Sequence, residues 1–152
     1  MDDARDAASR SRGQRALVRQ CIRPAVTTIE RHAHLAAAAY LMRRAGDTAV
    51  IVTADDESRR PIGVITDTDI AQAVADQRDL NDVRINELVG PEPLTTQPDT
   101  TVGEAAALML SMGLRQLPVV ENGHLVGIFD ITAACRELLG AGPYSHQTSV
   151  LR

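Results

Sequence analysis

Lysine is absent from this chain of 152 residues, and all 16 of its basic residues are arginine. Schiff-base chemistry and a Walker-type phosphate loop are therefore excluded, because both need a lysine. Tryptophan is also absent, and Tyr40, Phe129 and Tyr144 are the only aromatic residues. A stacking platform for single-stranded nucleic acid is not expected from so few rings. The formal net charge of −4 argues against a general DNA-binding protein, although a local arginine patch stays open.

Cysteine is scarce as well, since only Cys21 and Cys135 occur and they lie far apart. No Cys-x-x-Cys or Cys/His metal spacing is present, so we expect neither a disulfide framework nor a metal site. The first residues contain no apolar core of the signal-peptide type. The longest apolar stretch, Ala36–Met42, is far shorter than the ~20 residues that cross a bilayer. These absences predict a soluble cytoplasmic protein without a membrane partner.

Hydrophobic residues make up 44% of the chain and charged residues 24%, which is the composition of a folded protein. Residues 1–14 are polar, charged and small, and we expect them to form a disordered tail. An arginine-containing arm that touches a partner is the alternative. Residues 141–152 are expected to form a second loose tail.

An internal repeat lies between the tails and is the most informative feature of the sequence. The triplet at Val26 matches that at Leu94, 68 positions later, and the same offset aligns Ala37–Ala39 with Ala105–Ala107. A four-residue deletion in the second copy then gives an offset of 64. With that offset, Ile62–Ile65 aligns with Val126–Phe129.

Each copy is predicted to fold as strand, helix, strand, strand, helix, which makes an α/β (α+β) protein of two β-α-β-β-α repeats. In the second copy, the expected elements are strand 94–96, helix 102–112, strands 116–121 and 124–129, and helix 130–139. The first copy follows the same plan with strands at 49–53 and 62–66 and a helix at 67–77. We place the first repeat at residues 15–80, a linker with a short helix at 81–90, and the second repeat at 91–140.

The sequence resembles a tandem pair of cystathionine-β-synthase (CBS) domains. The run GVITDTDI, Gly63–Ile70, and the longer run Thr101–Asp130 carry the resemblance in register with the repeat. The resemblance implies two copies packed around a pseudo-two-fold axis, with two clefts between them. It implies further that such clefts bind AMP, ADP, ATP or S-adenosylmethionine, and that two pairs associate as a homodimer.

The first cleft retains the residues that an adenine nucleotide needs. The resemblance assigns Thr66 to the phosphate and Asp69 to the ribose hydroxyls, although Thr66-x-x-Asp69 is also an ordinary capping box. It assigns Arg115 to the phosphate, with a solvated arginine as the alternative. The remaining expected ligand contacts are Leu94, Thr95, Leu114 and Gln116, while Ile65 is better explained as core.

The second cleft departs from this pattern. Asp130 stands where Thr66 stands, Ala133 replaces Asp69, and Asp47 aligns with Arg115 at the offset of 68. Acidic residues repel a phosphate, so we expect this cleft to hold no nucleotide, or a neutral or cationic group. A Mg²⁺ ion between Asp47 and Asp130 is conceivable, but two carboxylates are weak evidence for a metal.

The sequence is consistent with four functions to different degrees. A regulatory module that senses an adenine nucleotide and signals through dimer geometry or an effector protein agrees best with the first cleft. A ligand-free structural dimerisation module is the alternative, favoured by the degraded second cleft. An enzyme is disfavoured, because no nucleophile–base pair or cofactor motif is present. A protein that recognises nucleic acid through its N-terminal arginines is the least favoured alternative besides an enzyme.

The histidines His32 and His34 form a possible metal-binding pair, but no further ligands lie near them in sequence.

Overall fold

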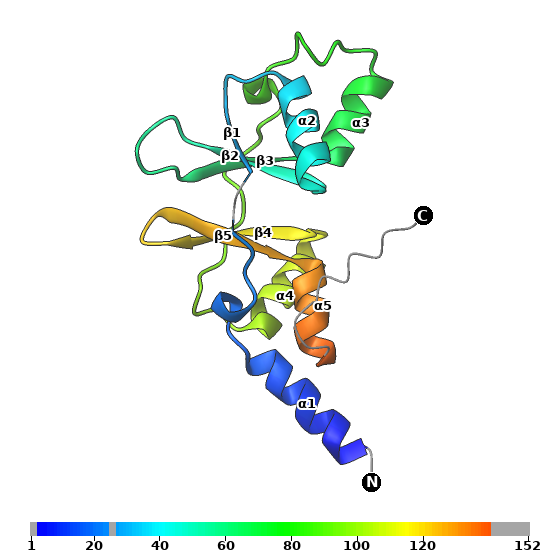
Figure 1. Cartoon of the computed structure of the whole chain (residues 1–152), viewed down its shortest axis with the longest axis vertical. Coiled ribbons are helices and arrows are strands. Elements are labelled where there is room, and N and C mark those ends of the chain that lie inside the picture. The colour runs from blue at the N-terminus through cyan, green and yellow to red at the C-terminus, as the bar shows by residue number, and fades with distance from the viewer. Residues whose placement is uncertain (1–2, 25–26, 141–152) are drawn as a thin grey trace.

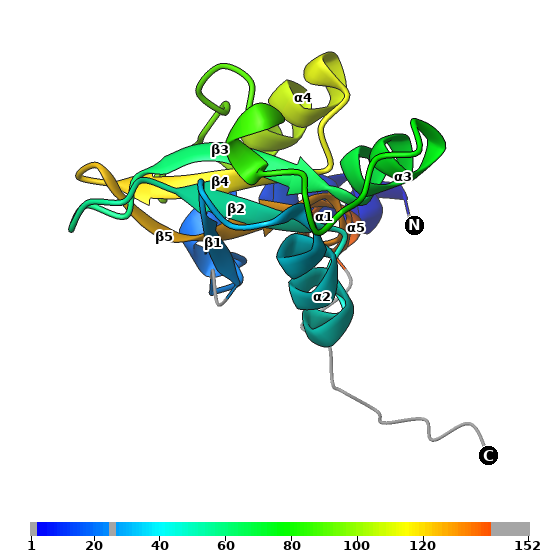
Figure 2. The ribbon, with the colours of Figure 1, turned by 90° about the horizontal axis from the view of Figure 1, so that it is seen from above.

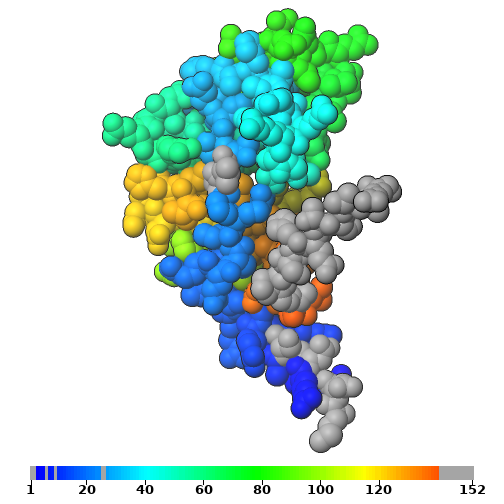
Figure 3. Space-filling model, viewed as in Figure 1, coloured from blue at the N-terminus to red at the C-terminus, as the bar shows by residue number. Residues whose placement is uncertain are grey.

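The computed structural model describes residues 3–24 and 27–140, so the expected C-terminal tail at 141–152 lies outside the described residues. The first repeat forms the upper half of Figure 1 and the second repeat the lower half. Their strands meet in the middle of the long axis. Figure 2 shows the strands of one repeat stacked over those of the other. The repeats therefore pack through their sheets, and Figure 3 shows the two halves in contact along this side of the molecule.

The first repeat contains a three-stranded sheet in the order β1-β2-β3, in which β1 is parallel and β3 antiparallel to β2. All five residues of β2 are buried, as expected for a central strand. The elements are β1 Thr28–Glu30, α2 Leu35–Ala45, β2 Ala49–Thr53, β3 Pro61–Thr66 and α3 Asp67–Ala75.

The second repeat contains the antiparallel hairpin β4–β5 and two helices. The predicted hairpin turn is confirmed: Asn122 and Gly123 both have positive φ, as an Asn-Gly turn of this type requires. The expected strand at 94–96 is reduced to one parallel bridge between Thr96 and Val119. The elements are α4 Val102–Met112, β4 Gln116–Glu121, β5 His124–Asp130 and α5 Ile131–Leu139.

The structure corrects the register of the repeat from 68 to 67 positions. Gly46 and Gly113 end equivalent helices in the left-handed conformation, and they lie 67 residues apart. The buried pair Met42 and Met109 has the same spacing. The offset of 68 was wrong because runs of alanine and of β-branched residues match equally well after a slip of one position. The deletion is therefore three residues, since the helix-capping residues Thr66 and Asp130 keep the offset of 64. Arg115 consequently corresponds to Thr48, not to Asp47.

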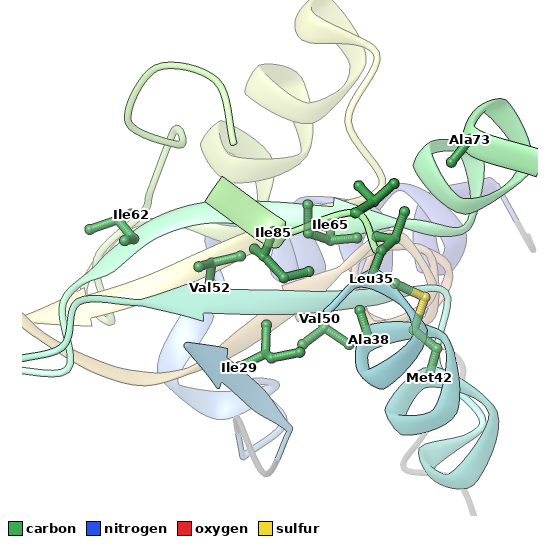
Figure 4. Packing of buried hydrophobic residues seen from close by; sticks show 11 residues of the cluster. Ile29, Leu35, Ala38, Met42, Val50, Val52, Ile62, Ile65, Ala73 and Ile85 are labelled. Carbon is green, nitrogen blue, oxygen red and sulfur yellow. The ribbon is translucent and has the colours of Figure 1, made fainter. Parts of the chain in front are cut away.

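Each repeat receives part of its core from the segment that precedes the other repeat. Ile85, in the 3-10 helix Ile85–Glu87, is fully buried in the first hydrophobic cluster (Figure 4). Val18, in the 3-10 helix Val18–Gln20, is fully buried in the second cluster. The segment expected as a linker at 81–90 is thus part of the first core. This exchange ties the two repeats into one folding unit.

Helix α1, Asp3–Arg15, occupies the segment that was expected to be a disordered tail. It packs against α5 and α4 at the lower end of Figure 1. The prediction failed because α1 is polar almost all round and has no apolar stripe. Its docking depends on a close backbone approach instead. A Cβ at the buried Gly13 would lie 2.2 Å from the carbonyl oxygen of Glu137 in α5.

Gly13→Ala is therefore expected to detach α1 or to shift it away from α5. Overpacking of this kind costs about 1–3 kcal/mol, which exceeds the roughly 1 kcal/mol that alanine gains over glycine in a helix. Urea denaturation with limited proteolysis of α1 measures the effect. Gly90→Ala is the control, because nothing lies within 4 Å of a Cβ there. Unchanged or increased stability of Gly13→Ala would show that the close approach is not required.

Candidate functional site

A cleft of about 390 Å³ lies between the two repeats, where β3 ends and α3 begins. The first repeat contributes the N-terminal turn of α3, which presents Thr66, Asp67 and Thr68. The second repeat contributes Leu94 and the loop after α4. Backbone N–H groups at the start of a helix attract anions, so this end of the cleft is suited to a phosphate.

Five of the seven ligand contacts expected from sequence line this cleft together: Thr66, Leu94, Leu114, Arg115 and Gln116. Thr95 and Asp69 are not among its lining residues. Leu94 and Leu114 come from the second repeat, 28 and 48 positions after Thr66, so only the fold brings them together. The expected grouping is therefore mostly present, and the roles of the individual residues stay predictions.

Asp69 turns back onto the residue that begins its own helix. Its carboxylate accepts hydrogen bonds from the backbone N–H of Thr66 at 2.7 Å and from the Thr66 hydroxyl at 3.0 Å. The Asp69 N–H in turn donates to the Thr66 hydroxyl oxygen at 3.4 Å. The capping box that was the alternative reading of this motif is thus formed. If Asp69 also held a ribose, its carboxylate would have to accept hydrogen bonds from both Thr66 and the ribose hydroxyls.

The charged residues lining the first cleft are Arg115 and Asp67, and their side chains lie 3.7 Å apart. Both are substantially exposed, so this ion pair is weak and a stronger anion can replace Asp67 beside the guanidinium. Gln116 Nε2 donates to the hydroxyl of Thr48 at 3.3 Å and so connects the two repeats at the bottom of the cleft.

Sequence reasoning missed several lining residues, among which Thr48, Asp67, Thr68 and Gly90 matter most. Thr48 would have been found with the correct register, because it is the counterpart of Arg115. Asp67 and Thr68 lie inside the Thr66-x-x-Asp69 motif and face the cleft from the first turn of α3. No sequence motif points to Gly90. It matters because the absence of a side chain leaves open space in the cleft.

The second cleft, of about 730 Å³, is related to the first by the repeat but has different chemistry. At the corrected register, Asp47 stands in place of the apolar Leu114, and Thr48 in place of Arg115. Arg23 stands in place of Gly90, so a long side chain fills the space that the first cleft leaves open. At these three positions the second cleft therefore has an acid, a hydroxyl and an arginine where the first has a leucine, an arginine and a glycine, although its volume is larger.

Arg23 connects the two acidic residues of the second cleft. Its guanidinium makes two contacts with Asp47, at 3.0 and 2.9 Å, and one with Asp130 at 3.2 Å. The Asp47 and Asp130 side chains are only 15% and 20% exposed. The hydrogen bond to Asp47 is the main reason that the pKa of Arg23 is raised, so the guanidinium stays charged. The place considered for Mg²⁺ is therefore filled by the protein's own cation.

Within residues 3–24 and 27–140, no group of three or more His, Cys, Asp or Glu side chains is arranged to hold a metal ion. His32 lies 3.6 Å from Asp55 at the surface. His34 serves as the N-terminal capping residue of α2.

Cys21 lines the second cleft, and burial raises the pKa of its thiol to about 11, with smaller contributions from Glu137 and Asp130. At pH 8 only about one thiol in a thousand is then the reactive thiolate. We expect iodoacetamide to modify the exposed Cys135 well before Cys21, with the order read by mass spectrometry. Cys135→Ser is the control, in which the fast reaction should vanish. Equal rates at both cysteines would contradict this account of the second cleft.

Comparison with known protein families gives a match for each of the two repeats. The CBS-domain family model matches residues 18–76 and 85–140, so it covers most of the chain. The chain belongs to the CBS-domain family. Its paired α/β repeats are the paired CBS domains, and the resemblance seen in sequence is confirmed.

Relatives of this CBS pair include two uncharacterized archaeal proteins. MK0525 of Methanopyrus kandleri is 33% identical over 108 residues, which are 70% of this chain and 52% of that protein. MJ1225 of Methanocaldococcus jannaschii is 29% identical over 138 residues, 89% of this chain and 48% of that protein. The chain thus spans about half the length of these relatives.

A solved structure, the CBS domain protein PAE2072 from Pyrobaculum aerophilum complexed with AMP, is also similar. It has a TM-score of 0.72 and 27% sequence identity, and the match covers 78% of this chain and 90% of that one. None of the described helices of the CBS pair is long and apolar enough to span a membrane.

Proposed function

We propose that this CBS pair is a regulatory module that binds an adenosine-containing nucleotide of the AMP, ADP or ATP type in its first cleft. The convergence of Thr66, Arg115 and Leu114 from two repeats on one cleft carries the proposal. The hydroxyl, the guanidinium and the start of α3 suit a phosphate, and the leucines suit a purine. The AMP complex of the similar archaeal protein supports the same ligand class.

Regulation follows if the ligand favours one arrangement of the repeats over another. A nucleotide can shift such an equilibrium only through different affinities for the two arrangements. The walls of the first cleft belong to both repeats, so a change in their arrangement would change the contacts with a bound nucleotide. We propose that the signal leaves the module through the geometry of a homodimer or through an effector protein. The role is one of binding, without a catalytic step.

Thermal unfolding against AMP, ADP, ATP, S-adenosylmethionine and NAD tests the proposal. A ligand at 100 times its Kd that binds only the folded chain adds about 2.7 kcal/mol of stability. The midpoint should then rise by roughly 5–10 °C for a chain of this length. A rise with an adenosine compound supports sensing, whereas no rise with any of them overturns it.

A second candidate function is a ligand-free structural module for dimerisation or protein interaction. The observation that favours it is the self-filled second cleft, where Arg23 already pairs with Asp47 and Asp130. The hydrogen bond from Thr66 to Asp69 favours the same function, because it engages the carboxylate that was expected to hold the ribose. The thermal panel separates the two functions, because a structural module should unfold at the same temperature with every ligand.

A further inference from the structure

The formal charges of the residues lining the two clefts bear on how many phosphate groups a bound nucleotide can have. The first cleft contains Arg115 and Asp67, whose charges cancel. The second contains Arg23 and Arg136 with Asp47 and Asp130, and it shares Arg115 with the first. Among the residues that the structure describes, three arginines and three aspartates line the two clefts together, and their formal charges sum to zero.

The two clefts meet at Thr48, Arg115 and Gln116, which line both. The N–H of Asp67 donates to the carbonyl of Thr48 at 2.9 Å, so the start of α3 lies beside this shared boundary. A phosphate chain bound at the start of α3 would therefore extend toward the second cleft as it lengthens. There it would approach the group formed by Arg23, Asp47 and Asp130. The guanidinium of that group is already engaged at three contacts by two carboxylates, and the group carries a net charge of −1. Arg136 is also engaged within the molecule.

We infer that the first cleft selects a nucleoside monophosphate and discriminates against the di- and triphosphate. This inference rests on the proposed function, since it concerns the ligand of the same cleft. One phosphate finds the guanidinium of Arg115 and the N-terminus of α3. Each further phosphate adds negative charge with no unpaired cation to meet it among the described lining residues, and it approaches Asp47 and Asp130, whose low exposure leaves the repulsion weakly screened.

Calorimetric titration with adenosine, AMP, ADP and ATP, in the absence of Mg²⁺ and at constant ionic strength, tests the inference. We expect AMP to bind about tenfold or more tightly than ATP, with ADP between them and adenosine weaker than AMP. Asp67→Asn removes the carboxylate beside Arg115 and should narrow the ratio of ATP to AMP dissociation constants several-fold. Asp82→Asn, an exposed carboxylate outside both clefts, should leave the ratio unchanged.

The outcomes separate this inference from the function on which it rests. ATP binding as tightly as AMP, or an unchanged ratio in Asp67→Asn, overturns the selectivity and leaves nucleotide binding intact. Adenosine binding as tightly as AMP also overturns it, because the phosphate would then not be recognised. Binding of no adenosine compound at all overturns the proposed function itself.

Discussion

Arg115→Gln is expected to weaken AMP binding by about 5- to 30-fold. A charge-assisted contact between a guanidinium and a phosphate contributes roughly 1–2 kcal/mol more than a neutral amide can supply. The fold should persist, because Arg115 is 64% exposed and its 3.7 Å contact with Asp67 is weak. Calorimetric titration of AMP into the wild type and the variant measures the loss.

Arg43→Gln is the matched control for this experiment. Arg43 is an exposed arginine in the last turn of α2, and it lines neither cleft. Its replacement removes the same charge from the molecule without touching the site. Equal losses of AMP affinity in both variants would show that Arg115 acts only through the net charge of the chain. Full AMP affinity in Arg115→Gln would remove Arg115 from the site altogether.

Arg23→Gln is expected to lower the free energy of unfolding by about 1–2 kcal/mol. The substitution leaves Asp47 and Asp130, both largely buried, facing one another without the cation that joins them. Leaving a fully buried charge unpaired costs about 3–5 kcal/mol, and the 41% exposure of Arg23 reduces this figure through solvent screening. Urea denaturation at neutral pH measures the change.

Two further variants make the Arg23 experiment specific. Arg19→Gln breaks the ion pair with Asp99, which is exposed on both sides, and should change stability little. Arg23→Gln combined with Asp47→Asn should regain part of the lost stability, because one of the two facing charges is gone. A double variant that is less stable than Arg23→Gln alone would show that repulsion between the carboxylates is not the cause.

The repeat and most of the first cleft could be predicted from sequence because they depend on local patterns. Alternating apolar runs, an Asn-Gly turn and a capping box each specify structure over a few residues. Two copies in order then indicate how the halves pair. The error of one position in the register arose where alanine and valine runs carry no unique marker, and the helix-ending Gly46 and Gly113 settled it.

The features that sequence could not predict depend on contacts across the fold. Helix α1 has no apolar stripe, and its docking rests on the absence of a side chain at Gly13 opposite Glu137. Arg23 pairs with residues 24 and 107 positions away, and its local sequence gives no hint of either. The same holds for Asp69, whose motif fits a ribose contact and a helix cap equally well.

The number of AMP molecules bound per chain tests the central claim most directly, since the claim is that one cleft is competent and that Arg23 in the other is already paired with Asp47 and Asp130. Calorimetric titration of the full chain measures this number. The account predicts one AMP per chain, with the affinity of that one site lowered in Arg115→Gln. Two AMP molecules per chain would show that the second cleft opens despite Arg23, and would contradict the account.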